Sequence, residues 1–416
     1  MSSTDIEPAV SRRPARYHAK REAILAAAAL AINEQSAKGL TLADVGRRVG
    51  LTTTSVTYYF KKKEDLAAAC FSRTLDKLLE ILDQALEEPT PQLRVRRYLS
   101  LHMARLARIQ AGQEAPFAVL SDLRAMEDPL RGQLLAGWRT VFRRTRSLWG
   151  SPATRVHADL YGARAHLLLE KTFWLPVWLD RYDAYEFDRL EARMMQLLTH
   201  GIAAAGQPWA PELIPLVQIQ DDETVNRDAF LRVATRLMNE VGYRGASVER
   251  ISAELKVTKG SFYHHMDAKD DLITACYDRS FNIMTTAQRL SDTVAGNHWR
   301  RLSSVLASIL DLQLANGEGL LRTTALTSVP AHEFALMLER SHRIAQSYAG
   351  MISDGVAEGS MRPVDPFIAS QGLVALQNAA FDMRSWASTM PRERAVALYA
   401  ASLAFGMFDD RVLEAL

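Results

Sequence analysis

The chain has 416 residues, enough for two to three domains of ordinary size. Apolar residues make up 48% and charged residues 24%, which are ordinary globular values and exclude wholesale disorder. No apolar stretch approaches the ~20 residues that span a bilayer, and the first residues lack the apolar core of a secretory signal. Two cysteines cannot form a disulfide framework. We therefore expect a cytoplasmic protein that does not insert into a membrane.

The two halves of the chain carry opposite net charges. Residues 1–210 contain 30 Lys+Arg and 23 Asp+Glu, a net charge of +7, whereas residues 211–416 contain 20 and 25, a net charge of −5. A polyanionic partner would therefore prefer the first half. The alternative is two solvated surfaces of unequal charge.

An internal repeat organises the chain. The 51 residues that start at Arg21 align without a gap with those that start at Arg227, at a constant offset of 206, and 14 positions are identical. The identical pairs include Asn33/Asn239, Glu34/Glu240, Gly39/Gly245, Thr52/Thr258, Ser55/Ser261, Lys63/Lys269 and Cys70/Cys276. Two copies of one module, each followed by a longer segment, account for the whole chain.

The repeat predicts two domains, at residues 1–206 and 225–416, joined by a linker at 207–224. The linker carries three prolines and ends in acidic residues, as linkers commonly do. Elsewhere apolar residues recur at helical spacing, as at Phe230, Val233 and Leu237, and strand-like alternation is scarce. The predicted fold class is therefore all-α.

Each repeat has the pattern of a helix-turn-helix. A long first helix is expected to end at Gly39 or Gly245, because glycine suits the left-handed position after a helix. A short second helix and a third helix should follow after N-cap residues, which are Thr41 and Thr52 in the first repeat and Ser247 and Thr258 in the second. Such a unit lays its third helix in the major groove of DNA.

These residues resemble the DNA-binding segment of the TetR family of one-component transcriptional regulators. The second repeat matches the family pattern at Thr258, Gly260, Phe262, Tyr263, His265, Lys269 and Leu272, and Met266 stands where phenylalanine is usual. The first repeat departs twice. Thr54 replaces a glycine, and Thr57 replaces the tyrosine that contacts a phosphate in the family. The motif covers about 50 residues of each half.

The resemblance implies a fold and a mechanism. Each domain should hold an N-terminal three-helix DNA-binding segment, about 17–66 and 225–272, and a C-terminal helical bundle for ligand binding and dimerisation, about 67–206 and 273–416. Ligand binding would change the separation of the two recognition helices and release the operator. The implied partners are double-stranded operator DNA and a small apolar effector. We expect no cofactor and no metal.

The resemblance also assigns DNA contacts. Base edges should be read by Thr53, Thr54 and Ser55 in the first repeat, and by Lys259, Gly260 and Ser261 in the second. Hydroxyl, imidazole and ammonium groups should hold phosphates, namely those of Thr41, Thr57, Tyr58, Tyr59 and Lys63, and of Ser247, Tyr263, His264, His265 and Lys269. Thr52 and Thr258, at the starts of the third helices, complete the predicted interface.

The two predicted interfaces differ in chemistry. Lys259 can donate to guanine, whereas the hydroxyls and methyls of the first repeat suit thymine methyl groups. Unequal half-sites are therefore expected. Residues 1–71 have a net charge of +4 and residues 222–277 one of −1. The first motif should consequently supply more of the salt-dependent affinity.

Several of these residues also have a purely structural interpretation. Tyr58, Tyr59, His264 and His265 could pack in the core, and Lys61–Lys63 could be a solvated face. The basic arm, Arg12, Arg13, Arg16, Lys20 and Arg21, could enter a minor groove or remain a disordered tail. Cys70 and Cys276 suit apolar packing, and a redox switch is the alternative.

The segments after each motif contain aromatic residues at helical spacing, a pattern of core packing from which a ligand pocket also draws. The pocket candidates are Trp138, Phe142, His166, Phe173 and Trp174 in the first half, and Phe334, Asn378 and Phe381 in the second. His166 and Glu170 lie four residues apart on one helix face and could ligate a metal, but a structural hydrogen bond is the preferred interpretation.

The leading prediction is a ligand-responsive repressor whose two fused domains act as an internal pseudo-dimer, with the linker raising their local concentration. A homodimer of chains, with four DNA-binding segments, is the alternative assembly. The second function considered is a helical sensor or interaction protein that has lost operator binding. An enzyme is not expected, because the sequence has no Gly-rich phosphate loop, nucleophile elbow or metal-spaced Cys/His set.

Overall fold

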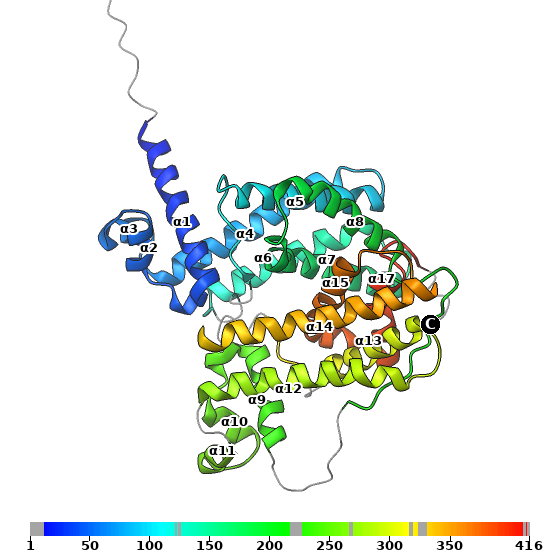
Figure 1. The fold of residues 1–416 in the computed structure, drawn as a ribbon. Helices are drawn as coiled ribbons and strands as arrows, with labels where there is room; N and C mark the ends of the chain where they lie inside the picture. The colour runs from blue at the N-terminus through cyan, green and yellow to red at the C-terminus, as the bar shows by residue number, and fades with distance from the viewer. Residues whose placement is uncertain are drawn as a thin grey trace, which may run out of the picture. The chain divides into compact units, whose positions relative to one another are not determined.

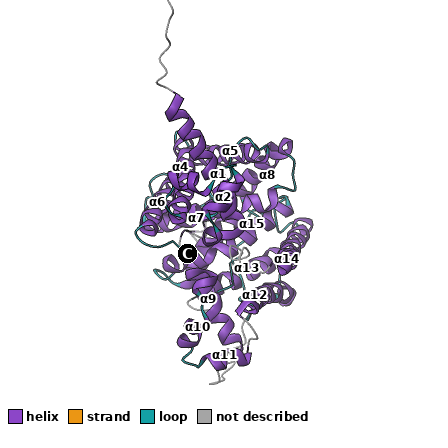
Figure 2. Ribbon diagram, turned by 90° about the vertical axis from the view of Figure 1, so that its left-hand side faces the viewer, coloured by secondary structure: helices purple, strands orange, loops and turns teal. Residues whose placement is uncertain are grey.

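The structure is a computed structural model that describes residues 12–120, 123, 126–216, 227–265, 269–315, 319–322, 331–410 and 413. The side chains of residues 12–15, 243–244, 265, 269–270 and 331–334 lie outside this description. Every named element of the described residues is a helix, as the sequence predicts (Figures 1 and 2). None of these helices is both long and apolar enough to cross a bilayer.

Contacts divide the chain into two compact units. The first contains Met1–Leu78 and Ala111–Arg139, and the second contains Leu79–Gln110 and Thr140–Leu416. The second unit includes residues from both halves of the chain. The domain boundaries drawn from the repeat therefore remain a prediction.

The first helix-turn-helix lies in the first unit. Its helices are α1 (Arg12–Gly39), α2 (Leu42–Arg48) and α3 (Thr53–Tyr59), and α4 (Lys63–Leu86) follows. The side chain of Thr41 accepts a hydrogen bond from the Asp44 amide at 3.1 Å, and that of Thr52 accepts one from the Ser55 amide at 3.2 Å. Both predicted N-caps are therefore confirmed, because each satisfies an amide that the helix leaves unpaired.

The second helix-turn-helix lies in the second unit. Its helices are α9 (Arg227–Gly245), α10 (Val248–Glu254) and α11 (Lys259–His265), and α12 (Lys269–Leu290) follows. Ser247 caps α10 by accepting from the Arg250 amide at 3.2 Å, and the Thr258 hydroxyl accepts from the Ser261 amide at 3.3 Å. These caps confirm the prediction for the second repeat.

The prediction that Gly39 and Gly245 take the left-handed conformation is wrong. The left-handed residues lie three positions earlier, at Ser36 (φ 65°) and Gly242 (φ 77°). Gly39 and Gly245 are needed for space, because a Cβ at Gly39 would lie 3.0 Å from Gln35 Cβ and one at Gly245 would lie 2.8 Å from a Val241 methyl.

Ser36 holds a backbone conformation that almost only glycine adopts, with ψ 163°. We expect Ser36→Gly to raise the free energy of unfolding by about 1 kcal/mol, since the strain is relieved and part of the gain is lost to the greater freedom of glycine in the unfolded chain. Urea unfolding followed by circular dichroism measures the change.

The matched control is Gly242→Ser in the second repeat, which should lower the free energy of unfolding by a similar amount. A Cβ there meets nothing within 4 Å, so only the backbone conformation is tested. If both variants leave stability unchanged, the left-handed turn carries no strain.

Two helices near the end of each half pack together within the second unit. They are α7 (Arg155–Leu179) and α8 (Phe187–His200) from the first half, and α15 (Pro366–Ala379) and α17 (Arg392–Ala404) from the second. Both α7 and α8 contact both α15 and α17. The result is a four-helix arrangement to which each half contributes two helices.

Other helices pack around these four. The unit also contains α5 (Pro91–Gln110), part of α6 (Leu130–Arg146), α13 (His298–Leu314), α14 (Ala331–Glu358), α16 (Arg384–Ala387) and the short 3-10 helices η2 (Ser147–Trp149), η3 (Ala184–Glu186), η4 (Ser291–Thr293) and η6 (Ala380–Met383). Helix α5 contacts α7 and α8, and α13 contacts α15 and α17. Figure 1 shows α12, α13 and α14 side by side.

The chain ends of the two halves exchange equivalent hydrogen bonds. The Ile202 amide donates to the Leu403 carbonyl at 3.1 Å, and the Met407 amide donates to the Leu198 carbonyl at 2.7 Å. The two bonds are related by an offset of 205 residues. The donors Ile202 and Met407 are counterparts of each other, and so are the acceptors Leu198 and Leu403. Reciprocal contacts of this kind characterise a two-fold interface.

Two glycines permit this exchange, which we call the reciprocal joint. Gly201 (φ 69°) and Gly406 (φ 98°) stand at counterpart positions. A Cβ on Gly201 would collide with the Ala404 carbonyl, and one on Gly406 with the Thr199 carbonyl. The backbones can approach only because neither residue has a side chain.

The described part of the predicted linker is fastened to α13. The amides of Glu212 and Ile214 donate to the hydroxyls of Ser304 and Ser308 at 2.9 and 2.8 Å. The Trp299 indole donates to the Pro208 carbonyl at 2.9 Å. Residues 207–216 are therefore held along one helix of the second half, and residues 217–224 lie outside the described part of the chain.

The two cysteines occupy equivalent buried positions. The thiols of Cys70 and Cys276 each lie 3.6 Å from a backbone carbonyl of the first helix of their repeat. Burial raises the pKa of both thiols to about 12. A protonated, buried thiol suits the packing role that the sequence predicts.

Candidate nucleic-acid interface

The first recognition helix, α3, presents its N-terminal side chains to solvent. Thr53 and Thr54 are exposed, and Ser55 is half-buried with its hydroxyl 2.9 Å from that of Thr52. Val56, on the opposite face, is completely buried and anchors the helix. The predicted base-reading residues are therefore accessible on a helix fixed from behind.

The predicted phosphate contacts of the first repeat are not equally available. The Thr57 hydroxyl donates to the Thr54 carbonyl at 2.8 Å, and the Lys63 ammonium donates to the Lys38 carbonyl at 2.9 Å. Tyr58 is 70% exposed. Of these three side chains, Tyr58 is the one best placed for a phosphate, whereas Lys63 closes the end of α1.

Tyr17 is a member of this surface that sequence reasoning missed. Its ring stacks on Tyr59 at 4.9 Å between centroids and meets Tyr58 edge-on at 6.3 Å. The basic residues Arg16 and Lys20 beside it are exposed on α1. The stack thus connects the predicted basic arm with the end of the recognition helix. The side chains of Arg12 and Arg13 lie outside the described residues.

The second recognition helix, α11, has the same exposure pattern. Lys259 and Gly260 are exposed, Ser261 is half-buried, and Phe262 is buried against Phe230 with ring centroids 5.8 Å apart. Tyr263 is 54% exposed. His264 is also exposed. The predicted side chains of His265 and Lys269 lie outside the described residues.

Lys259 is paired with a carboxylate of the preceding helix. Its ammonium lies 2.5 Å from Glu249 Oε1, and both side chains are more than half exposed. Lys259 is the largest cause of the lowered pKa of Glu249, about 2. Ala43 is the counterpart of Glu249 in the first repeat. The second interface therefore carries a carboxylate, next to its predicted base-reading lysine, that the first interface lacks.

Two equivalent asparagines tie the DNA-binding segments to the chain that follows. Asn33 donates to the Phe117 carbonyl and accepts from the Val119 amide, both at 2.8 Å. Asn239 makes the same pair of bonds, with the Leu320 carbonyl at 2.9 Å and the Arg322 amide at 3.1 Å. Identity of the two residues in the repeat was the signal that sequence reasoning left unused.

The predicted pocket residues are dispersed over several elements. Trp138, Phe142, Phe173, Trp174 and Asn378 are half-buried, His166 and Phe381 are buried, and the side chain of Phe334 lies outside the described residues. The Trp174 indole donates to Gln371 Oε1 at 3.0 Å, and His166 Nδ1 lies 3.0 Å from the Tyr399 hydroxyl. These two residues contact helices of the other half.

Residues 24–70 and 230–276 match the family model of "Bacterial regulatory proteins, tetR family". This chain therefore carries two TetR-family segments in tandem. Each match includes the helix-turn-helix and the start of the following helix, up to Cys70 or Cys276. The resemblance drawn from the sequence is confirmed at both places.

Known proteins similar to this chain include a transposon product. The Transposon Tn10 TetC protein of Escherichia coli is 38% identical over 93 residues, which are 22% of this chain and 47% of that protein. The chain thus spans about half the length of this curated relative.

Several solved structures resemble this chain over part of its length. The crystal structure of apo AibR has 21% identity and a TM-score of 0.36, and covers 43% of this chain and 98% of its own. The structure of AibR in complex with isovaleryl coenzyme A and operator DNA has 20% identity and a TM-score of 0.36. It covers 43% of this chain and 97% of its own. The structure of the TetR family transcriptional regulator PfmR from Thermus thermophilus has 17% identity and a TM-score of 0.34. It covers 41% of this chain and 96% of its own.

The ion pair between Glu249 and Lys259 allows DNA binding by the second TetR-family segment to be tested with one substitution. We expect Glu249→Gln to strengthen binding to DNA several-fold at moderate salt, because it removes a carboxylate from the predicted DNA-binding face and releases Lys259 from its ion pair. Fluorescence anisotropy on a fragment selected from a random library measures the change.

Glu393→Gln is the control for net charge, since Glu393 is exposed at the start of α17 and lies outside both helix-turn-helix segments. It should leave the affinity almost unchanged. Equal effects of the two variants would mean that only the total charge matters, and that α11 is not at the DNA.

Proposed function

We propose that this chain is a DNA-binding transcriptional regulator, a repressor that reads its operator with both TetR-family segments as an internal pseudo-dimer. A small apolar ligand, bound in the helical part of the chain, releases the operator. The observation that carries the proposal is the reciprocal joint, because it gives one chain the arrangement that usually requires two.

The recognition helices support the DNA-binding part of the proposal. In each half a short, N-capped helix exposes its first residues and buries one apolar anchor, Val56 or Phe262. Exposed residues at the start of such a helix are the ones that meet base edges in the major groove. The exposed residues differ between Thr53 and Lys259, which supports two unequal half-sites.

The reciprocal joint supports the pseudo-dimer. Helices α7 and α8 of the first half contact α15 and α17 of the second, and the chain ends exchange counterpart hydrogen bonds. A homodimeric regulator reads a palindrome with two identical helices. Fusion of the two halves frees each recognition helix to acquire its own sequence preference.

A second candidate is a regulator that binds DNA through the first segment alone. The ion pair between Lys259 and Glu249 favours it, because that pair occupies the lysine expected to reach guanine. In this case the second segment serves as a structural partner.

We expect the chain, alone and on a selected DNA fragment, to have the mass of one chain by light scattering at moderate salt. The bound site should contain two half-sites about one helical turn apart. A two-chain mass would contradict the internal pseudo-dimer, because the two-fold axis of the assembly would then lie between two chains. A selected site with one half-site would favour binding through the first segment, and failure to select any fragment would favour a sensor without DNA binding.

The reciprocal joint can be broken at one glycine. We expect Gly406→Ala to lower the unfolding temperature and to reduce the affinity for the two-half-site fragment at least tenfold, because the new Cβ collides with the Thr199 carbonyl and loosens the pairing of the halves. Thermal unfolding and anisotropy measure the two effects.

Gly359→Ala is the matched control. Gly359 is also left-handed, at φ 85°, but a Cβ there meets nothing within 4 Å. It should share the backbone strain and lack the effect on DNA affinity. If both variants bind DNA like the unmodified chain, the joint is not needed for operator binding.

A further inference from the structure

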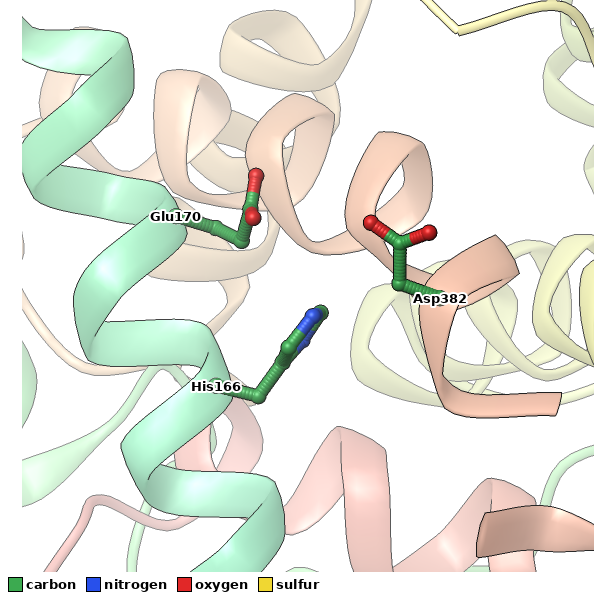
Figure 3. A group of neighbouring side chains, drawn as sticks. All are labelled: His166, Glu170 and Asp382. Atoms are coloured by element: carbon green, nitrogen blue, oxygen red, sulfur yellow. The ribbon is translucent and has the colours of Figure 1, made fainter. Parts of the chain in front are cut away.

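A group of metal-ligating side chains lies where the two halves meet, away from both helix-turn-helix segments. His166 and Glu170 project from one face of α7, and Asp382 projects from η6 of the second half (Figure 3). One ligand atom from each lies within 4.8 Å of the others. Figure 3 shows the three side chains converging on a common point.

The surroundings fix the orientation of two of these groups. His166 is 6% exposed, and its Nδ1 lies 3.0 Å from the hydroxyl of Tyr399, which is completely buried in α17. A histidine that ligates a metal commonly uses its other ring nitrogen for such a hydrogen bond.

Asp382 is held by Arg322, whose two terminal nitrogens contact the two carboxylate oxygens at 3.0 and 2.8 Å. The side chains of both residues are nearly buried, at 11% and 13% exposure. Each carboxylate oxygen has a second lone pair for an ion. Arg322 therefore fixes the direction in which the Asp382 carboxylate faces the other two groups.

Two buried donors flank Asp382. Asn378 and Trp386 lie four residues before and after it in the sequence, in α15 and α16. Asn378 Nδ2 and Trp386 Nε1 have no hydrogen-bond partner among the described residues. Such donors suit oxygen ligands, such as water, at the open positions of an ion.

We propose that His166, Glu170 and Asp382 bind one divalent transition-metal ion per chain, of the Zn²⁺ type. One imidazole and two carboxylates form a donor set that Zn²⁺ accepts with three protein ligands and an open position. Ligand bonds of about 2.0–2.2 Å place tetrahedral ligand atoms about 3.4 Å from one another. The separations in this group, which are within 4.8 Å, must therefore shorten by up to about 1.4 Å.

The ion would join the two halves, because two ligands come from α7 and the third from η6. It binds the folded chain and thereby stabilises it by mass action. A site at this position acts on the packing of the halves directly. This proposal is independent of DNA binding, and its test uses no DNA.

The test is titration of the chelator-treated full chain with Zn²⁺, followed by calorimetry and by thermal unfolding, with Mg²⁺ as the contrasting ion. We expect one Zn²⁺ per chain at micromolar affinity or tighter, a raised unfolding temperature and no response to Mg²⁺. Co²⁺ should give the visible absorption of a four- or five-coordinate site.

Variants locate the ion. Glu170→Gln, which keeps the shape and removes the charge, should weaken Zn²⁺ binding more than tenfold, and Tyr399→Phe about tenfold through the orientation of His166. His157→Gln is the matched control. His157 lies at the start of α7, away from the group, and its Nε2 is 3.9 Å from a carboxylate oxygen of Asp410. It should change nothing.

Two results would overturn the proposal. One is the absence of Zn²⁺ binding at micromolar concentration. The other is binding that Glu170→Gln leaves intact while circular dichroism shows an unchanged fold, since the ion then sits elsewhere.

Discussion

The close approach of two backbones at Gly201 and Gly406 is the constraint on which the arrangement of the halves depends. Each glycine faces a carbonyl of the other half, at Ala404 and Thr199, with no room for a Cβ. The counterpart hydrogen bonds at Ile202 and Met407 can form only at this separation. Helices α7, α8, α15 and α17 therefore meet at an interface that a single methyl group would disrupt.

Outside this joint the two halves keep the same contacts with different chemistry. In the first, Arg48 of α2 pairs with Glu34 of α1 at 2.6 Å. In the second, Glu254 of α10, the counterpart of Arg48, pairs instead with Arg236 of α9, the counterpart of Leu30. One fused chain need not keep its two recognition helices identical, as a homodimer must. The difference between Thr53 and its counterpart Lys259 is consistent with the same freedom.

The sequence predicts the features that depend on near neighbours. N-caps are set by one side chain and an amide three residues away, so Thr41, Thr52, Ser247 and Thr258 were predictable. The role of Gly39 was not, because a glycine needed for a left-handed turn and one needed for space look alike in a sequence. Only the structure shows that Ser36 takes the turn.

Contacts between distant residues lay beyond the reach of the sequence. Lys63 was predicted at a phosphate, yet it bonds Lys38, 25 residues away. Glu249 drew no attention because nothing in a sequence places it beside Lys259, on another helix. His166 and Tyr399 are 233 residues apart and belong to different halves. Spacing on one helix revealed His166 and Glu170 as a pair, but the third member, Asp382, depended on how the halves pack.

Several polar groups where the halves meet are paired across them. A buried polar group costs free energy unless it is paired. Trp174 finds a partner in Gln371, and His166 finds one in Tyr399, each across the two halves. Separation of the halves would break both hydrogen bonds, which makes the paired arrangement specific as well as stable. Any molecule or ion that contacts these groups changes the free energy of that arrangement directly.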